Sequence, residues 1–260
     1  MKKFIALILA VIFTLSLSAC GAEETVSDLD YITKNGKIVV GITDFAPMDY
    51  QDENGNWVGF DADMAKEFAE YLGVEVEFIV IDWDNKIFEL ENKSIDVVWN
   101  GMTLTDKVKN AMGCADPYCK NAQVVVVKAE VADQYQDEAS LANLAFAVEA
   151  GSAGKEIIES LGYSFTEVAY QSDALMEVAA GTSDACVIDL LMAGAMIGEG
   201  TAYPNLTYTV SLTSEEYVVG FRKGSDLVEK FNQFWADSCA DGIVLEIAKL
   251  YGVQESVILK

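Results

Sequence analysis

The chain has 260 residues with an unusual charge balance: 42 side chains are acidic and 17 are basic, for a formal net charge of −25. Such a surface repels phosphates, so nucleic-acid binding is excluded, and it also repels anionic lipid headgroups. The sequence contains no histidine, which excludes Ser-His and Cys-His catalysis and imidazole-based metal sites. Its one arginine is Arg222.

The N-terminus combines the basic start MKK with the apolar run FIALILAVIFTLSLS, which is short for a membrane span. The run ends in LSAC, and a Leu-x-Ala-Cys ending on such a run resembles the lipobox of bacterial lipoproteins. We therefore predict a lipoprotein signal peptide over residues 1–19, lipidation of Cys20 and a polar tether over residues 20–30. The alternative is an ordinary signal peptide with an incidental cysteine.

Beyond the tether, apolar segments alternate between strand and helix patterns. The first cycle predicts strands at 37–42, 74–82, 95–99 and 122–128, and helices at 61–73 and 84–93. In the first helix Asp61 is expected as the N-cap and Gly73 as the stop. The run AQVVVVK at 122–128 is continuously apolar, as expected of a strand with both sheet faces covered.

A second cycle begins near residue 139 and ends in helical patterns that close the chain. It predicts strands at 164–170, 184–189 and 215–223, and helices at 172–181, 190–198, 226–242 and 243–252; before these, residues 143–162 contain a strand, a glycine-rich turn and a helix. The alternation predicts an α/β fold with mostly parallel sheets, and two cycles predict two lobes. Ligands in open α/β sheets lie beyond the carboxyl ends of the strands, so the loops after VVGI, VVW, AVEA and CVID are where a site is expected.

Four cysteines follow Cys20 in the sequence. Their spacing lacks the C-x2-C pattern of thiolate metal sites, so structural or free thiols are expected and no metal site is predicted. A disulfide between the first two stays open, because pairing cannot be deduced from spacing. The four are Cys114, Cys119, Cys186 and Cys239.

The segment NGKIVVGITDFAPMDYQDENGNWVGFDADMAKEFAEYLGVEVEF, followed in order by NGMTLT, DPY and GTSDACVID, resembles the extracytoplasmic amino-acid-binding proteins of ABC importers, solute-binding family three. The resemblance covers roughly residues 32–251. It implies two α/β lobes joined by two hinge strands that close on a small solute, and a membrane permease with a separate ATPase as partners. By this match one lobe spans 31–127 plus 221–260, and the other spans 128–220.

The resemblance also places the aromatic side chains of the site. Phe45 falls on one aromatic wall and Trp83 on the opposite wall, which would add cation–π attraction for a cationic ligand. Asp44 is placed less firmly, because its loop is one residue shorter than usual. The alternative for both aromatic residues is a place in the core.

The polar contacts follow from the same match. Asn100, Gly101 and Thr103 fall on the loop that binds ligand amino and carboxylate groups. Asp189 falls on the carboxylate that pairs with the ligand's ammonium. Its alternative is a helix cap before Leu190, a position that favours aspartate.

Two departures from the family pattern concern the ligand's carboxylate. The arginine expected three residues after Thr105 is Val108, and the hydroxyl residue expected after Ser152 is Ala153. Loss of a buried bidentate pair costs about 3–5 kcal/mol by analogy with broken buried ion pairs. Arg222 matches the strand leaving the second lobe and offers no replacement.

These departures predict a site tuned away from ordinary α-amino acids. Ser152 at a helix N-terminus and a swing of Lys107 would retain some affinity for anions. We hypothesise an amine-bearing or cationic solute that lacks a free α-carboxylate or holds it differently.

The sequence therefore predicts a monomeric, lipid-anchored, extracytoplasmic solute-binding protein with no catalytic residue and no cofactor. Alternatives are a sensor that reports a ligand to a membrane partner and, on the same fold, a dehydratase. Paired carboxylates are mostly solvated surface in a chain this acidic, which disfavours the enzyme.

Overall fold

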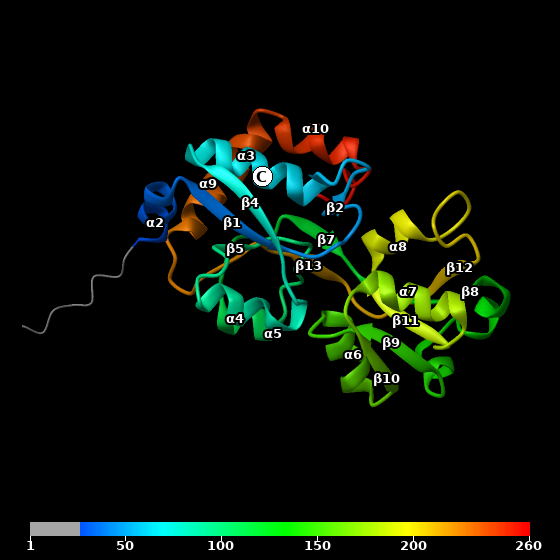
Figure 1. Cartoon of the computed structure of the whole chain (residues 1–260). Coiled ribbons are helices and arrows are strands. Elements are labelled where there is room, and N and C mark those ends of the chain that lie inside the picture. The colour runs from blue at the N-terminus through cyan, green and yellow to red at the C-terminus, as the bar shows by residue number, and fades with distance from the viewer. Residues whose placement is uncertain (1–26) are drawn as a thin grey trace, which may run out of the picture.

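The computed structural model describes residues 27–260, which fold into two α/β lobes, each built on a five-stranded sheet (Figure 1). The predicted signal peptide and Cys20 lie outside the described residues. Helix α2 (Asp28–Asn35) is capped by Ser27, whose hydroxyl accepts from the Asp30 N–H. This helix begins at Asp28, within the segment 20–30 predicted as a tether, and the extent of the tether stays a prediction.

The first lobe contains five strands in the order β4-β1-β5-β14-β6. The strands are β1 (Lys37–Ile42), β4 (Glu75–Val80), β5 (Val97–Val98), β6 (Gly113–Cys114) and β14 (Gly220–Phe221). Strand β1 pairs in parallel with β4 and β5, whereas β14 is antiparallel to both of its neighbours. A hairpin of β2 (Tyr50–Gln51) and β3 (Trp57–Val58) follows β1.

Helices cover both faces of this sheet (Figure 1). Three lie on one face: α3 (Phe60–Leu72), α9 (Leu227–Ala240) and α10 (Ile243–Leu250). On the other face lie η1 (Trp83–Asn85), α4 (Lys86–Glu91) and α5 (Asp106–Ala111). The cap predicted for α3 is wrong: Gly59 is the N-cap residue, and Asp61 lies fully buried in the first turn.

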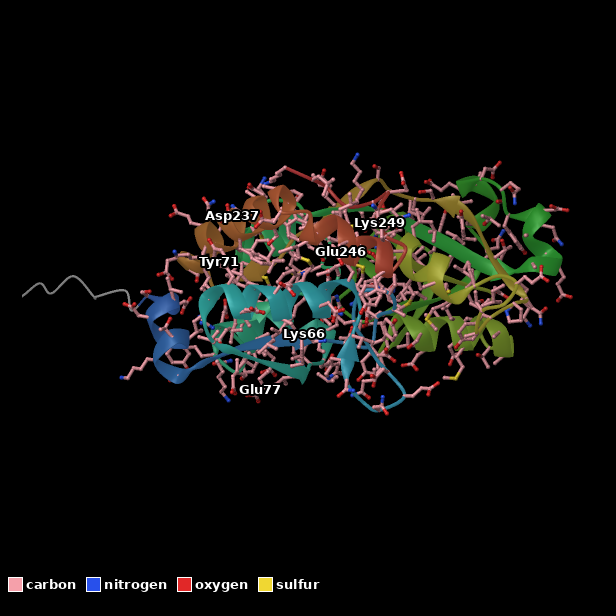
Figure 2. The ribbon with its side chains drawn as sticks, turned by 90° about the horizontal axis from the view of Figure 1, so that it is seen from above. Lys66, Tyr71, Glu77, Asp237, Glu246 and Lys249 are labelled. Atoms are coloured by element: carbon pink, nitrogen blue, oxygen red, sulfur yellow. The ribbon has the colours of Figure 1, made fainter. Side chains whose placement is uncertain are left out.

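An aromatic core holds α3 and α9 against the first sheet. Phe68 of α3 lies 5.5 Å from Phe231 and 5.0 Å from Phe234 between ring centroids, and Trp99 lies 4.9 Å from Phe231. Buried aromatic residues contribute strongly to core stability because each removes a large apolar area from water. At the rim, the Tyr71 hydroxyl of α3 donates to Asp237 of α9 at 3.3 Å (Figure 2).

The second lobe contains a sheet in the order β10-β9-β11-β8-β12. The strands are β8 (Gln123–Lys128), β9 (Ala145–Glu149), β10 (Ser164–Val168), β11 (Ala185–Asp189) and β12 (Leu206–Ser211). The helices are α6 (Ala153–Leu161), α7 (Gln171–Ala180) and α8 (Leu190–Met196), with short turns η2 (Ala129–Gln134) and η3 (Glu138–Leu141). The four valines of β8 are fully buried, which confirms the prediction that both faces of this strand are covered.

Two short antiparallel strands, β7 (Cys119–Asn121) and β13 (Glu215–Tyr217), run between the lobes (Figure 1). They are the two hinge strands expected for this fold. Strand β8 pairs with β11 and β12, so it belongs to the second sheet. We therefore propose that the chain enters the second lobe near residue 122, before the boundary at 127 and 128 that the sequence suggested.

Within residues 27–260, no helix is long and apolar enough to cross a membrane. Across the same residues no group of cysteine, aspartate and glutamate side chains is arranged to hold a metal ion. The four described cysteines have free thiols.

Candidate functional site

A cleft lies between the lobes. Its lining comes from loops after β1, β4 and β5 on one side and from the ends of β9 and β11 on the other, so it meets the expectation that ligands lie beyond the carboxyl ends of strands. The cleft brings together all ten residues predicted from the sequence: Asp44, Phe45, Trp83, Asn100, Gly101, Thr103, Val108, Ser152, Ala153 and Asp189. Their contact with a ligand stays a prediction.

The Asn100 side chain is engaged by its own lobe. Its Oδ1 accepts from the Thr43 N–H at 2.8 Å and from the Thr43 hydroxyl at 2.6 Å, and its Nδ2 donates to Asp49 Oδ2 at 2.7 Å. The next N–H, that of Gly101, donates to Asp61 Oδ2 at 2.7 Å. The buried carboxyl groups of Asp49 and Asp61 therefore hold this loop in place.

Gly101 is required at its position. Its φ is 54°, and a Cβ there would meet the Phe45 ring at 2.2 Å. The absent side chain lets Phe45 lie against the loop. The Phe45 ring also lies edge-on to the Tyr217 ring, with 6.4 Å between the ring centroids. Phe45 and Trp83 are 4% and 7% exposed, so both are largely buried although they line the cleft.

Asp189 ends β11 and is held by four side chains. Its Oδ1 accepts from Tyr217 at 2.8 Å, from Gln123 at 3.0 Å and from Asn121, and its Oδ2 accepts from Gln171. Burial, and after it the nearby Glu215 charge, raises the pKa of Asp189 to about 7. Asp189 also occupies the N-cap position of α8, as the alternative expected, but its side chain makes no cap hydrogen bond.

Sequence reasoning missed Glu149, the last residue of β9. Its side chain lines the cleft and the residue is 4% exposed. Burial, followed by the charge of Asp189, raises the pKa of Glu149 to about 8. Glu149 ends the strand before the loop after AVEA, where a site is expected, and that position was the available signal.

Lys86, the first residue of α4, was also missed. It is 3% exposed, and its Nζ lies 4.5 Å from the centroid of the Trp83 ring. The ammonium donates to Trp83 O at 3.0 Å and, across the cleft, to Gly151 O at 2.8 Å. Burial lowers the pKa of Lys86 to about 8.

The lobes also touch at Gly151. Its φ is 70°, and a Cβ there would lie 2.6 Å from Asp84 Cα in the opposite lobe. Only glycine allows this approach, so the contact between the lobes at this point depends on the missing side chain. Beside it, the Ser152 hydroxyl accepts from the Lys155 N–H at 3.1 Å and caps α6.

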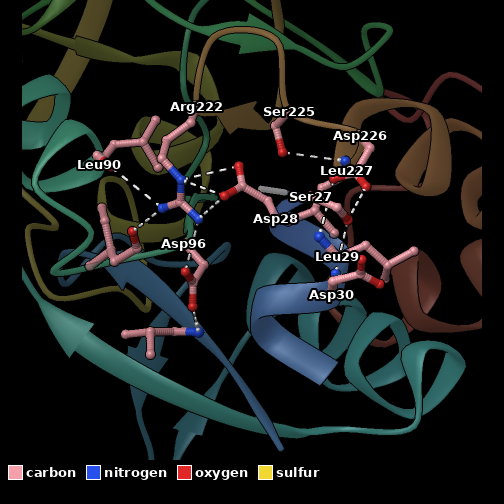
Figure 3. A network of polar contacts seen from close by, with 12 residues as sticks. Ser27, Asp28, Leu29, Asp30, Leu90, Asp96, Arg222, Ser225, Asp226 and Leu227 are labelled. Atoms are coloured by element: carbon pink, nitrogen blue, oxygen red, sulfur yellow. Dashed lines mark hydrogen bonds and ion pairs between the residues drawn. The ribbon is translucent and has the colours of Figure 1, made fainter. Parts of the chain in front are cut away.

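The two departures from the family pattern take different forms in the structure. Val108 is 3% exposed and packs in an apolar cluster with Trp83 and Leu90, so this part of the cleft wall is apolar. Ala153 leaves Ser152 as the hydroxyl at the N-terminus of α6. Arg222 lies in the first lobe on Asp28 and Asp96, not in the cleft (Figure 3).

Comparison with known proteins agrees with this arrangement. The family model of bacterial extracellular solute-binding proteins, family 3, matches residues 38–254. The arginine-binding extracellular protein of Bacillus subtilis is 28% identical over 239 residues, which cover 90% of this chain and 91% of that protein. A mutant of ArgBP from T. maritima has a TM-score of 0.80 and 32% identity, covering 86% of this chain and 99% of that chain.

One relative is an enzyme. The cyclohexadienyl dehydratase of Pseudomonas aeruginosa is 26% identical over 126 residues, which cover 48% of this chain and 47% of that protein. The match to the family model extends over most of the chain and includes both lobes. The chain belongs to the bacterial extracellular solute-binding proteins of family 3.

Proposed function

We propose that this protein is the substrate-binding component of an ABC importer, which captures an amino-acid-like or amine-bearing solute in the cleft and delivers it to a permease. The observation that carries the proposal is the cleft itself, to which both lobes contribute charged side chains. Four acidic side chains (Asp44, Glu149, Glu156 and Asp189) and two lysines (Lys86 and Lys107) line it. An excess of acidic groups favours a ligand that bears positive charge.

The relatives support the same class of ligand. The B. subtilis protein is named an arginine-binding extracellular protein, and the T. maritima protein is named ArgBP. A cation between Phe45 and Trp83 would gain about 0.5–2 kcal/mol from cation–π attraction. We further propose that the protein acts as a monomer and is held at the membrane by a lipid on Cys20.

A thermal-shift screen of the purified protein tests the binding function. The panel contains arginine, lysine, histidine and cystine, the decarboxylated amines of the first three, and betaines. A ligand at 100 times its Kd stabilises the folded state by about 2.7 kcal/mol, so a true ligand raises the melting temperature by several degrees. A panel in which no compound raises the melting temperature would refute the proposed ligand class.

Two further measurements separate the alternatives. Import requires that cells lacking this protein lose uptake of the labelled ligand, whereas a sensor leaves uptake unchanged and alters a signalling output. Recovery of the bound ligand unchanged after long incubation is expected of a binding protein. Its conversion to a product would instead establish an enzyme on this fold.

A further inference from the structure

Two buried ionisable side chains of the cleft, one basic and one acidic, lack an ion-pair partner. Lys86 is 3% and Glu149 is 4% exposed. Among residues 27–260, six pairs of a Lys or Arg with an acidic residue have an N–O distance within 4.0 Å, and neither Lys86 nor Glu149 belongs to any of them. Buried charges in proteins are normally paired, because an isolated charge in a low-dielectric interior is costly. Burial raises the pKa of Glu149 more than the Lys86 charge lowers it, so the two side chains act on each other without forming an ion pair. A ligand with a negative and a positive group would supply each of them with a direct counter-charge.

The hydrogen bonds of Lys86 point to an anion. An ammonium has three donors, and here two of them are used by neutral carbonyl groups, Trp83 O at 3.0 Å and Gly151 O at 2.8 Å. The third donor has no protein acceptor in the described structure. A carboxylate in the cleft would accept from it and would also neutralise the charge.

The surroundings of this ammonium favour an anion as well. Gly151, whose carbonyl it contacts, directly precedes Ser152, the N-cap of α6. This helix has nine residues, and its N-terminus opens on the cleft through Ser152 and Ala153. Helix N-termini attract negative charge through their unpaired N–H groups and the helix dipole.

Glu149 is the better partner for the ligand's positive group. The neighbouring Asp189 already accepts four hydrogen bonds from protein side chains, three of them on Oδ1, which leaves little acceptor capacity. The Glu149 side chain has fewer donors in the described structure, with only the Gln171 side chain as a hydrogen-bond partner that lowers its pKa. Glu149 lies two residues before Gly151, whose carbonyl accepts from the Lys86 ammonium. The Glu149 side chain and the Lys86 contact are therefore neighbours along the chain.

We propose that Lys86 and Glu149 recognise a zwitterion, with Lys86 binding the carboxylate and Glu149 binding the ammonium or guanidinium group. This inference rests on the proposed function and deepens it, because it names the substrate class as amino acids with a free carboxylate. Lys86 belongs to the first lobe and Glu149 to the second, so a bound zwitterion joins the lobes.

Calorimetry with matched pairs of probes tests the assignment. The probes are arginine and agmatine, lysine and cadaverine, and histidine and histamine, which differ only in the carboxylate. We expect the wild-type protein to bind at least one amino acid about 100-fold more tightly than its amine. Lys86→Met should remove that preference by weakening the amino acid about 100-fold or more while changing the amine less than threefold. Glu149→Gln should weaken both members of the pair.

Controls separate a binding role from a structural one. Lys37→Met removes an exposed ammonium that lies outside the cleft and should retain the preference for the amino acid. Lys86→Arg keeps a charged donor and should retain part of that preference. Because Lys86→Met removes a buried charge without an ion-pair partner, its urea midpoint without ligand should equal or exceed that of the wild type.

The outcomes distinguish this inference from the proposed function. Equal binding of an amino acid and its amine to the wild-type protein would overturn the role of Lys86 and leave the proposed function standing. Equal weakening of both probes by Lys86→Met would do the same. Failure of every probe to bind the wild-type protein would overturn both.

Discussion

The one arginine of the chain connects three parts of the first lobe that are far apart in sequence (Figure 3). Its Nε donates to Asp28 Oδ1 at 2.9 Å and to Oδ2 at 3.1 Å, and its Nη2 lies 3.1 Å from Asp96 Oδ1. Its Nη1 donates to Ile95 O at 2.9 Å. Arg222 therefore joins α2, the turn before β5 and the end of β14, and Arg222→Met should lower stability strongly.

The expected magnitude follows from burial. The Arg222, Asp28 and Asp96 side chains are 11%, 9% and 5% exposed. Removing one partner of a buried ion pair costs about 3–5 kcal/mol, because the remaining charge loses its compensation. Here two carboxylates lose it together. A chain of this size loses about 2–4 °C of melting temperature per kcal/mol, so we expect a decrease on the order of 10 °C.

Urea unfolding followed by tryptophan fluorescence at pH 7.5 measures the change. Lys37→Met is the matched control, because Lys37 pairs with Glu77 at 2.5 Å while both side chains are almost half exposed. Exposed pairs contribute little, so this variant should unfold like the wild type. Adding Asp28→Asn and Asp96→Asn to Arg222→Met should restore part of the stability. A loss below about 1 kcal/mol for Arg222→Met would refute the reasoning from buried ion pairs.

Three further variants test the cleft and the loop beneath it. Burial and the charge of Asp61 raise the pKa of Asp49, and burial raises the pKa of Asp61 to about 7. The folded state therefore retains protons that the unfolded state releases. As a result, the free energy of unfolding should fall as the pH rises from about 4 to 7. Asp49→Asn should flatten this profile and raise stability at pH 8 by about 1–3 kcal/mol in urea unfolding; an unchanged profile would contradict the shared burial. Val108→Arg should raise the affinity for amino acids about tenfold in calorimetry and leave amines unaffected, and equal effects on both would contradict a carboxylate contact. Gly151→Ala should weaken ligand binding about tenfold or more because its Cβ would meet the opposite lobe, whereas Gly162→Ala, with the same φ of about 70° and nothing within 4 Å, should bind normally; equal affinities would show that this approach is not needed for binding.

Local patterns in the sequence were sufficient for the architecture. Strand–helix alternation gave the two lobes, and the valine run of β8 correctly indicated a strand covered on both faces. The limit of such reasoning is visible in the same strand. Which sheet β8 joins depends on its pairing with β11 and β12, both more than 50 residues away, and no local pattern contains that information.

The site shows the same division. The family motifs brought ten residues to one cleft, yet three charged residues of that cleft, Lys86, Glu149 and Glu156, were missed. Lys86 lies in DNKIFELENK, where a lysine on a short amphipathic segment reads as solvated surface. Its burial results from the approach of Gly151 in the other lobe, which is a tertiary contact. Asp61 was similarly read as a cap because its buried partners, the Gly101 N–H and the Tyr118 hydroxyl, are distant in sequence.

The location of Arg222 bears on the chemistry of the cleft. Because the chain has one guanidinium and the first lobe holds it on two aspartates, any cation that meets a ligand carboxylate must be an ammonium. A guanidinium imposes a planar, two-point geometry on a carboxylate, whereas an ammonium acts as a point charge with rotatable donors. On the proposed assignment Lys86 therefore supplies charge without fixing the orientation of the carboxylate. Orientation must then come from the Phe45 and Trp83 rings and from Glu149, so we expect selectivity among amino acids to depend on the ligand's side chain more than on its backbone groups.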